Sequence, residues 1–98
     1  MVAGQAGHLL LMPMYMVIER FKAGQSAAVY ARFAEQGRML PPGLLYHDSW
    51  LRADDAVCYQ LMETDDPKSF DTWIARWDDI VEFEVQELKN KPTGRELT

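Results

Sequence analysis

The sequence predicts a single α+β domain whose strands and helices follow the order β-α-β-β-α-β. Three observations predict the strands: a β-branched and aromatic segment at residues 14–21, two apolar segments joined by a short turn at residues 44–64, and strict alternation at residues 81–88. Two segments with helical spacing of apolar residues lie between them. This is the ferredoxin-like arrangement, in which two helices cover one face of a four-stranded antiparallel sheet.

The first strand and helix follow from residues 14–36. The segment "MYMVIERF" at residues 14–21 suits a strand that is buried on both faces. Ser26 can cap the start of the following helix, and Gly37 suits the left-handed conformation that ends one. The apolar residues at helical spacing in this segment are Val29, Tyr30, Phe33 and Ala34.

The second half of the domain begins after "GRMLPPG", whose prolines and glycines break the helical pattern. Residues 44–52 and 56–64 predict a β-hairpin around the turn "ADD". In the next segment Asp66 is a good N-cap and Pro67 fits the first helical position. The apolar stripe of this helix, which we expect to be core, consists of Phe70, Trp73, Ile74 and Trp77.

The sequence divides into a domain and two flanking segments. Residues 1–13 carry no charge apart from the terminus and predict a flexible N-terminal extension, whereas residues 14–88 form the domain. Residues 89–98 are polar and predict a frayed tail. The apolar run near the N-terminus is interrupted by Pro13 and closed by Glu19, before it reaches the ~20 residues of a membrane span.

Composition limits the partners of the protein. Its 98 residues carry a net charge of -5, which disfavours nucleic acid and anionic membrane as partners. The single Cys58 excludes an intrachain disulfide, and with only two histidines it makes no zinc site unless carboxylates or another subunit contribute ligands. We expect no metal, no cofactor and a cytoplasmic location.

Strand alternation predicts how the uncovered face of the sheet is used. It places Tyr46, Asp48 and Trp50 on one side of the first hairpin strand. On the second hairpin strand it groups Cys58 with Gln60 and Met62. If both sets lie on the face that the helices leave open, a monomer exposes large apolar groups to water, so we expect a homodimer.

Four stretches of the sequence resemble a known family: "MYMVIERF", "GRMLPPGLLYHDSW", "CYQLMETDDPKSFDTWIARWDD" and "VEFEV". The family is a small bacterial one, domain of unknown function 3303, in the dimeric α/β-barrel superfamily. The resemblance covers about residues 14–87 and implies that two sheets join around a cavity. It implies no activity, because the superfamily holds cofactor-free monooxygenases, haem-degrading enzymes, lactone isomerases and proteins without a known reaction.

The candidate ligand-binding residues are Tyr46, Asp48, Trp50 and Gln60, which we expect to line one cavity and to suit a flat ligand with a hydroxyl or carbonyl group. Glu19 or Tyr15 can join Gln60, depending on the face that each occupies. The alternatives are a structural role for Asp48 and a cross-strand hydrogen bond for Gln60.

Other polar residues have plainer interpretations. His47 and Asp48 are neighbours on a strand and point to opposite faces, so they make no catalytic pair. His47 suits the surface, and Cys58 suits an inert buried thiol because no basic neighbour lowers its pKa. The acids that solvation explains are Asp65, Asp66, Asp78, Asp79, Glu82 and Glu84.

The leading functional hypothesis is a homodimeric protein that binds a small apolar or aromatic molecule in a barrel cavity. The alternative is a cofactor-independent monooxygenase or isomerase acting on an aromatic or quinone-like substrate. No histidine of the domain suits haem iron, which argues against haem degradation. A third possibility is a structural assembly whose barrel is filled by side chains.

Overall fold

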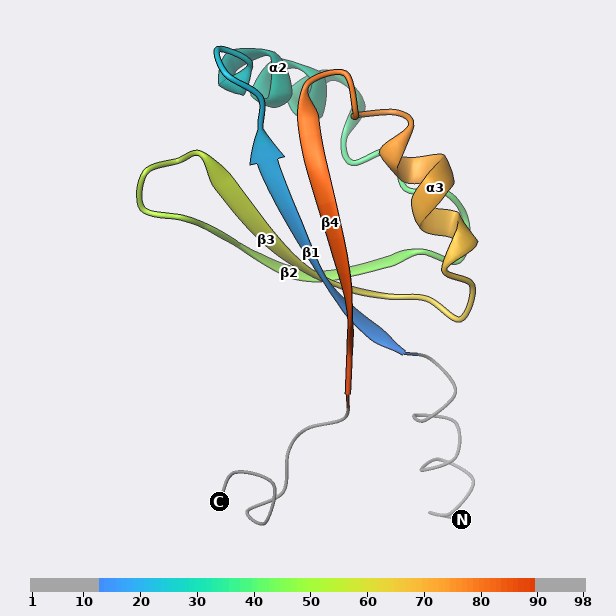
Figure 1. Cartoon of the computed structure of the whole chain (residues 1–98). Coiled ribbons are helices and arrows are strands. Elements are labelled where there is room, and N and C mark those ends of the chain that lie inside the picture. Colours follow the sequence, from blue (N-terminus) through green and yellow to red (C-terminus); the bar gives the residue numbers. More distant parts are fainter. Residues whose placement is uncertain (1–12, 90–98) are drawn as a thin grey trace, which may run out of the picture.

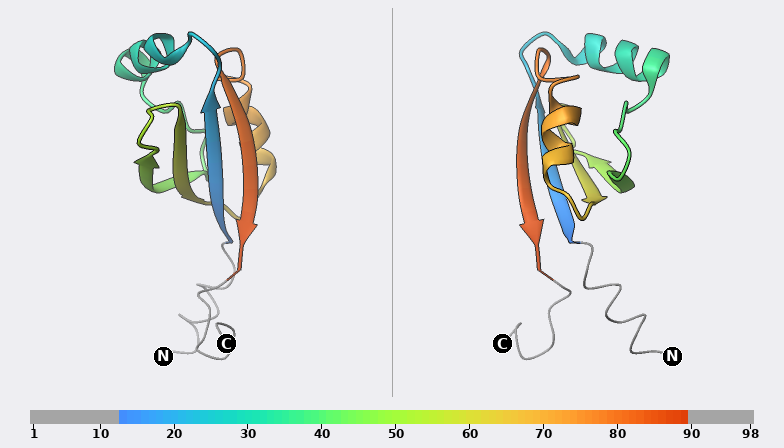
Figure 2. Two further views of the ribbon diagram at one scale, coloured as in Figure 1. Left: turned by 60° about the vertical axis from the view of Figure 1, so that its left-hand side comes forward. Right: turned by 90° about the vertical axis from the view of Figure 1, so that its right-hand side faces the viewer.

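The structure, a computed structural model, describes residues 13–89 and confirms the ferredoxin-like fold. The four strands form one sheet (Figure 1), and both helices lie on the same side of it in the right-hand view of Figure 2. The elements are β1 (Met14–Phe21), α2 (Ser26–Gln36), β2 (Leu45–Leu51), β3 (Val57–Glu63), α3 (Lys68–Ile74) and β4 (Val81–Leu88). The predicted extension and tail lie, except for Pro13 and Lys89, outside the described residues. None of the helices within the described range is long and apolar enough to cross a membrane.

The sheet has the strand order β2-β3-β1-β4, so β1 and β3 are central. Val17 of β1 lies opposite Gln60 of β3, and Glu19 lies opposite Cys58. Val17 is fully buried, which shows that this side of the sheet is the one that the helices cover. The expectation that Gln60 and Cys58 lie on the uncovered face is therefore wrong.

A β-bulge in β2 changes which residues share a face. Tyr46 pairs with Met62, but Asp48, and not His47, pairs with the next residue of β3, Leu61. His47 is an extra residue in the ladder, and such an insertion reverses the facing of every residue that follows. The prediction that Asp48 and Trp50 share a face with Tyr46 is therefore wrong.

Local side-chain bonds hold the bulge. His47 Nε2 lies 2.6 Å from Glu63 Oε1, which holds the extra residue against the neighbouring strand. Asp48 Oδ1 accepts a hydrogen bond of 2.8 Å from the backbone N–H of Ser49. Short polar side chains compete in this way with the regular ladder. As a result Ser49 lies opposite Gln60, on the helix side of the sheet.

The two ends of α2 were predicted with unequal success. Gly37 has φ 65° and its N–H donates to the carbonyl of Phe33 at 2.8 Å, which confirms it as the residue that ends the helix. Ser26 is the first helical residue and makes no capping hydrogen bond, so the predicted cap is wrong. Gln25 occupies the N-cap position, and its backbone N–H bonds to the carbonyl of Lys22.

Helix α3 is shorter than its apolar stripe. Asp66 Oδ1 accepts from the N–H of Lys68 at 3.1 Å, as expected of a cap, although Pro67 itself holds the N-cap position. The chain then continues in tight turns, in which the N–H of Trp77 donates to the carbonyl of Ile74 at 2.9 Å. Trp77 nevertheless stays buried, because these turns keep it on the side that faces the sheet.

Trp73 and Trp77 fix the loop after α2. Trp73 Nε1 donates to the carbonyl of Arg38 at 2.9 Å, and Trp77 Nε1 donates to the same oxygen at 3.0 Å. Trp73 is 1% exposed and packs against Phe83, with the ring centres 5.2 Å apart. These two indoles thus join the helix layer, the sheet and the loop around one carbonyl group.

We expect Trp73→Ala to lower the free energy of unfolding by about 3–5 kcal/mol, because it removes a buried indole and one donor to Arg38. Trp73→Phe keeps an aromatic ring and should cost less. Urea denaturation followed by circular dichroism measures both changes. A cost below about 1 kcal/mol for the alanine variant would contradict the central place of this side chain.

Candidate functional site

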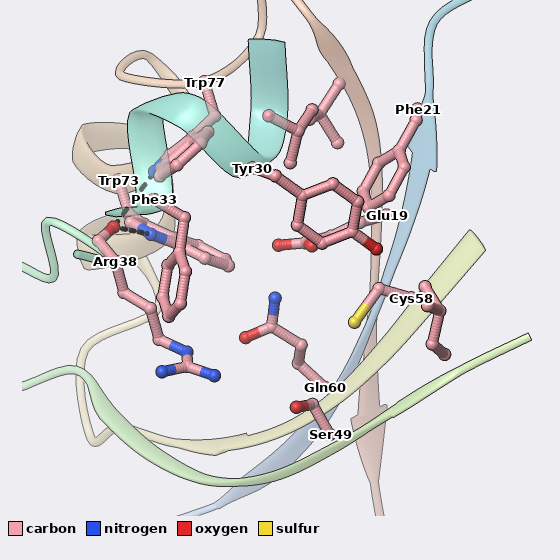
Figure 3. A pocket seen from close by; sticks show the side chains of 13 residues that line it. Glu19, Phe21, Tyr30, Phe33, Arg38, Ser49, Cys58, Gln60, Trp73 and Trp77 are labelled. Carbon is pink, nitrogen blue, oxygen red and sulfur yellow. Dashed lines mark hydrogen bonds between the residues drawn. The ribbon is translucent and has the colours of Figure 1, made fainter. Parts of the chain in front are cut away.

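A cavity of about 300 Å³ lies between the helix side of the sheet and the segments that cover it. Its wall is largely aromatic, with the polar side chains Glu19 and Gln60 on the sheet and Arg38 on the loop after α2 (Figure 3). A mostly apolar cavity with a few converging polar groups is the usual form of a small-molecule site. The aromatic residues of the wall are Phe21, Tyr30, Phe33, Trp73 and Trp77.

Helix α2 forms the outer wall of the cavity, and Arg32 holds it in place. The Arg32 guanidinium makes two hydrogen bonds of 2.8 Å to the carboxylate of Asp79 and one of 2.9 Å to the carbonyl of Arg76. Tyr30 and Phe33, on the same helix, line the cavity although they are 48% and 43% exposed. The cavity therefore opens to solvent beside these two rings.

Arg38 lies between two aromatic rings. Its guanidinium carbon is 3.5 Å from the centre of the Tyr46 ring and 5.1 Å from that of Phe33. The Tyr46 hydroxyl hydrogen-bonds with Ser49 Oγ at 2.7 Å, which ties this stack to the sheet. The next residue, Met39, has φ 59°, an unfavourable conformation for a side chain of this size. The backbone of the loop is therefore strained at the residue that follows Arg38.

Glu19 and Gln60 form the polar floor of the cavity. They are 8% and 6% exposed, so both side chains are almost fully removed from water. Burial raises the pKa of Glu19 from its usual 4.5 to about 7, while a hydrogen bond from the Gln60 side chain and the charge of Arg38 partly offset this effect. Gln60 Oε1 has no hydrogen-bond donor among the described residues.

Cys58 borders the same floor as a protonated thiol. Burial raises its pKa to about 11, and the neighbouring Glu19 adds to this effect while Arg38 acts against it. A thiol is a weak nucleophile, so this cysteine supplies apolar surface and no reactivity at neutral pH. Within residues 13–89 there is no group of three or more His, Cys, Asp and Glu side chains placed to hold a metal ion.

The four predicted site residues are not brought together. Gln60 lines the cavity. Tyr46 does not line it, but its ring stacks on Arg38 and its hydroxyl bonds to Ser49, and both of these residues do. Asp48 and Trp50 lie on the other face of the sheet because of the bulge. Of the two residues left open, Glu19 lines the cavity, whereas Tyr15 is core and packs edge-on against Phe70.

The sequence reasoning missed Arg38, Tyr30 and Phe33 as cavity residues, and it assigned Trp73 and Trp77 to the core alone. One signal was present, since Glu19 is an acid at alternate spacing with the apolar residues Val17 and Phe21. Nothing in the sequence indicates that Arg38 turns inward, because that depends on the two indole bonds to its carbonyl.

These features define a ferredoxin-like α+β domain with a cavity between its sheet and its helices. The chain belongs to the family described as Domain of unknown function (DUF3303), whose family model matches residues 13–87. The resemblance found in the sequence is thereby confirmed. The comparison with curated proteins found no match.

Two solved structures are similar to this chain at low identity. The crystal structure of PA3566 from Pseudomonas aeruginosa is 13% identical, with a TM-score of 0.54 over 83% of this chain and 96% of that one. A putative antibiotic biosynthesis monooxygenase from Chloroflexus aurantiacus J-10-fl is 18% identical, with a TM-score of 0.49 over 84% of this chain and 97% of that one. At these identities a likeness concerns the fold and carries no activity.

We expect Glu19 to make stability depend on pH. Because its pKa is about 7 in the folded state and about 4.5 when unfolded, the unfolded chain loses this proton first. The free energy of unfolding therefore falls by about 3 kcal/mol as the pH rises from 4.5 through 7.

Glu19→Gln removes this dependence, so its stability relative to the natural protein should rise over the same pH range. Urea denaturation at pH 5, 6, 7 and 8 measures the difference. Glu87→Gln, at an exposed position of β4, is the control and should show no such rise. A constant difference between the Glu19→Gln variant and the natural protein would mean that Glu19 titrates normally.

Proposed function

We propose that the protein is a homodimer that binds a small apolar or aromatic molecule in the cavity between its sheet and its helices. The observation that carries this proposal is a 300 Å³ cavity with aromatic walls and a few polar side chains, among them Glu19, Arg38 and Gln60. The two inner indoles and the two outer rings of α2 offer flat surfaces, which suit a flat ligand.

The face of the sheet opposite the cavity supports the dimer. Ile18 lies opposite Tyr59, and Met16 lies opposite Leu61, so an apolar strip runs across the two central strands. Trp50 adds an indole that is 50% exposed. Neither helix covers this face (Figure 2), and a second copy packed against it by twofold symmetry would remove the strip from water.

Light scattering at micromolar concentration should therefore give about twice the chain mass of 11.3 kDa. Leu61→Asp, which places a charge within the apolar strip, should shift the mass toward that of a monomer. Ala27→Asp adds the same charge on exposed α2 and should leave the dimer intact. A mass near 11.3 kDa for the natural protein would remove the dimer from the proposal.

Ligand binding is tested with 2-naphthol as an aromatic probe in isothermal titration calorimetry. Gln60→Leu should weaken binding about five- to tenfold, because it removes a buried hydrogen-bonding group of the cavity. Asp48→Asn, on the opposite face, should have no effect, and neither should Gln36→Leu on exposed α2. Equal affinities for the natural protein and the Gln60→Leu variant would show that the probe does not use this cavity.

A second candidate function is a cofactor-independent monooxygenase or isomerase acting on an aromatic or quinone-like substrate. The observation that favours it is Glu19, because a carboxyl group with a pKa of about 7 inside an apolar cavity is well matched to proton transfer at neutral pH. Oxygen uptake or isomer formation with hydroxylated naphthoquinones, lost in Glu19→Gln while binding persists, would establish this function in place of simple binding.

A further inference from the structure

Arg38 is a cation that lines the cavity without an acidic partner. The ion pairs among residues 13–89 belong to other cations, namely Arg20, Arg32, His47 and Arg52. The Arg38 guanidinium is held instead by the rings of Tyr46 and Phe33, and its Nε is buried with no hydrogen-bond acceptor in the described part of the chain. Its position is fixed, while its Nε donor is unused.

Gln60 has a buried acceptor without a donor, whereas Arg38 has a buried donor without an acceptor. The Gln60 amide lies near Glu19 and helps to lower the pKa of that carboxyl group, but its Oε1 is buried and has no donor among the described residues. In Figure 3 this oxygen lies on the Arg38 side of the amide, and the nitrogen lies on the Glu19 side. A buried donor and a buried acceptor without partners each cost free energy. The cavity thus holds one unused donor and one unused acceptor in side chains that border the same space.

We infer that the cavity recognises an aromatic hydroxy acid, whose carboxylate accepts a hydrogen bond from Arg38 and whose adjacent hydroxyl donates to Gln60 Oε1. This inference rests on the proposed function and specifies its ligand class. A carboxylate suits Arg38 because the guanidinium forms no ion pair among the described residues and makes charge-assisted hydrogen bonds. The hydroxyl supplies the donor that a carboxylate lacks, and the aromatic body lies against the indoles of Trp73 and Trp77.

Glu19 should make the binding of a carboxylate in this cavity depend on pH. The titratable groups that line the cavity with it are Tyr30 from α2, Arg38 from the loop and Cys58 from β3. Burial keeps the Cys58 thiol neutral, so below pH 7 Arg38 is the uncompensated charge of the cavity. A bound carboxylate therefore meets a neutral Glu19 below pH 7 and a like charge above it.

The test uses three naphthalenes that differ only in their polar groups: 3-hydroxy-2-naphthoate, 2-naphthoate and 2-naphthol. Calorimetry at pH 6 should show that the hydroxy acid binds at least tenfold more tightly than 2-naphthol. Arg38→Gln should weaken both carboxylates about tenfold and leave 2-naphthol unchanged. Gln60→Leu should weaken the two hydroxyl compounds and leave 2-naphthoate unchanged.

Matched controls separate these effects from general damage. Arg20→Gln lies on the opposite face of the sheet and should alter none of the three affinities. Arg38→Lys keeps the charge without the planar guanidinium and should retain part of the carboxylate preference. Between pH 6 and pH 8 the hydroxy acid should lose about tenfold in affinity, and Glu19→Gln should abolish this loss.

The outcomes distinguish the inference from the function on which it depends. If none of the three compounds binds, both the proposed function and the inference fail. If 2-naphthol binds as tightly as the hydroxy acid, or if Arg38→Gln weakens all three compounds equally, the inference fails while the binding function stands. Loss of the carboxylate preference in Arg38→Gln, with a circular dichroism spectrum like that of the natural protein, would support it.

Discussion

One carbonyl oxygen, that of Arg38, joins the parts of this structure. The Trp73 and Trp77 indoles, one in α3 and one in the turns after it, both donate to this oxygen, which lies in the loop that leads from α2 to the sheet. A third bond supports the same attachment, because the Arg76 guanidinium donates to the carbonyl of Met39 at 2.6 Å. The two indole bonds direct the Arg38 side chain toward the cavity. They lie next to Met39, whose backbone has a positive φ of 59°. Fold and site therefore depend on the same contact.

The cavity and the surface of the protein use acids in opposite ways. Asp54 and Asp79 each pair with an arginine at the surface, and these pairs lower the pKa of both carboxyl groups to about 2. Glu19 has no such partner, and burial raises its pKa to about 7. The protein thus keeps a carboxyl group where it opposes folding at neutral pH. Such a cost is typical of a functional site, where a strained or desolvated group is retained for its chemistry.

Much of the fold follows from the sequence because hydrophobic periodicity reports which elements form. Every strand and both helices were predicted within a few residues, and Gly37 ends α2 as its lack of a side chain suggests. The candidate site was predicted less well, because it depends on register. Periodicity does not indicate that β2 has a bulge at His47. This one extra residue places Asp48 and Trp50 on the face opposite that of Gln60, with which they were predicted to share a cavity. In β3, which contains no such irregularity, Cys58, Gln60 and Met62 do share a face as alternation predicts, but periodicity did not indicate that this is the face covered by the helices.

The bulge at His47 also determines how this chain can be compared with others. At the end of β2 the register is anchored by the hairpin turn, where the N–H of Arg52 bonds to the carbonyl of Val57 at 2.7 Å. At its start the strand is anchored by the pairing of Tyr46 with Met62. Between these anchors β2 is one residue longer than β3 requires. An alignment with a relative that lacks this residue must place its gap at position 47, since otherwise residues 48–51 are each matched to a residue of the opposite face and the cavity wall is assigned to the wrong side chains.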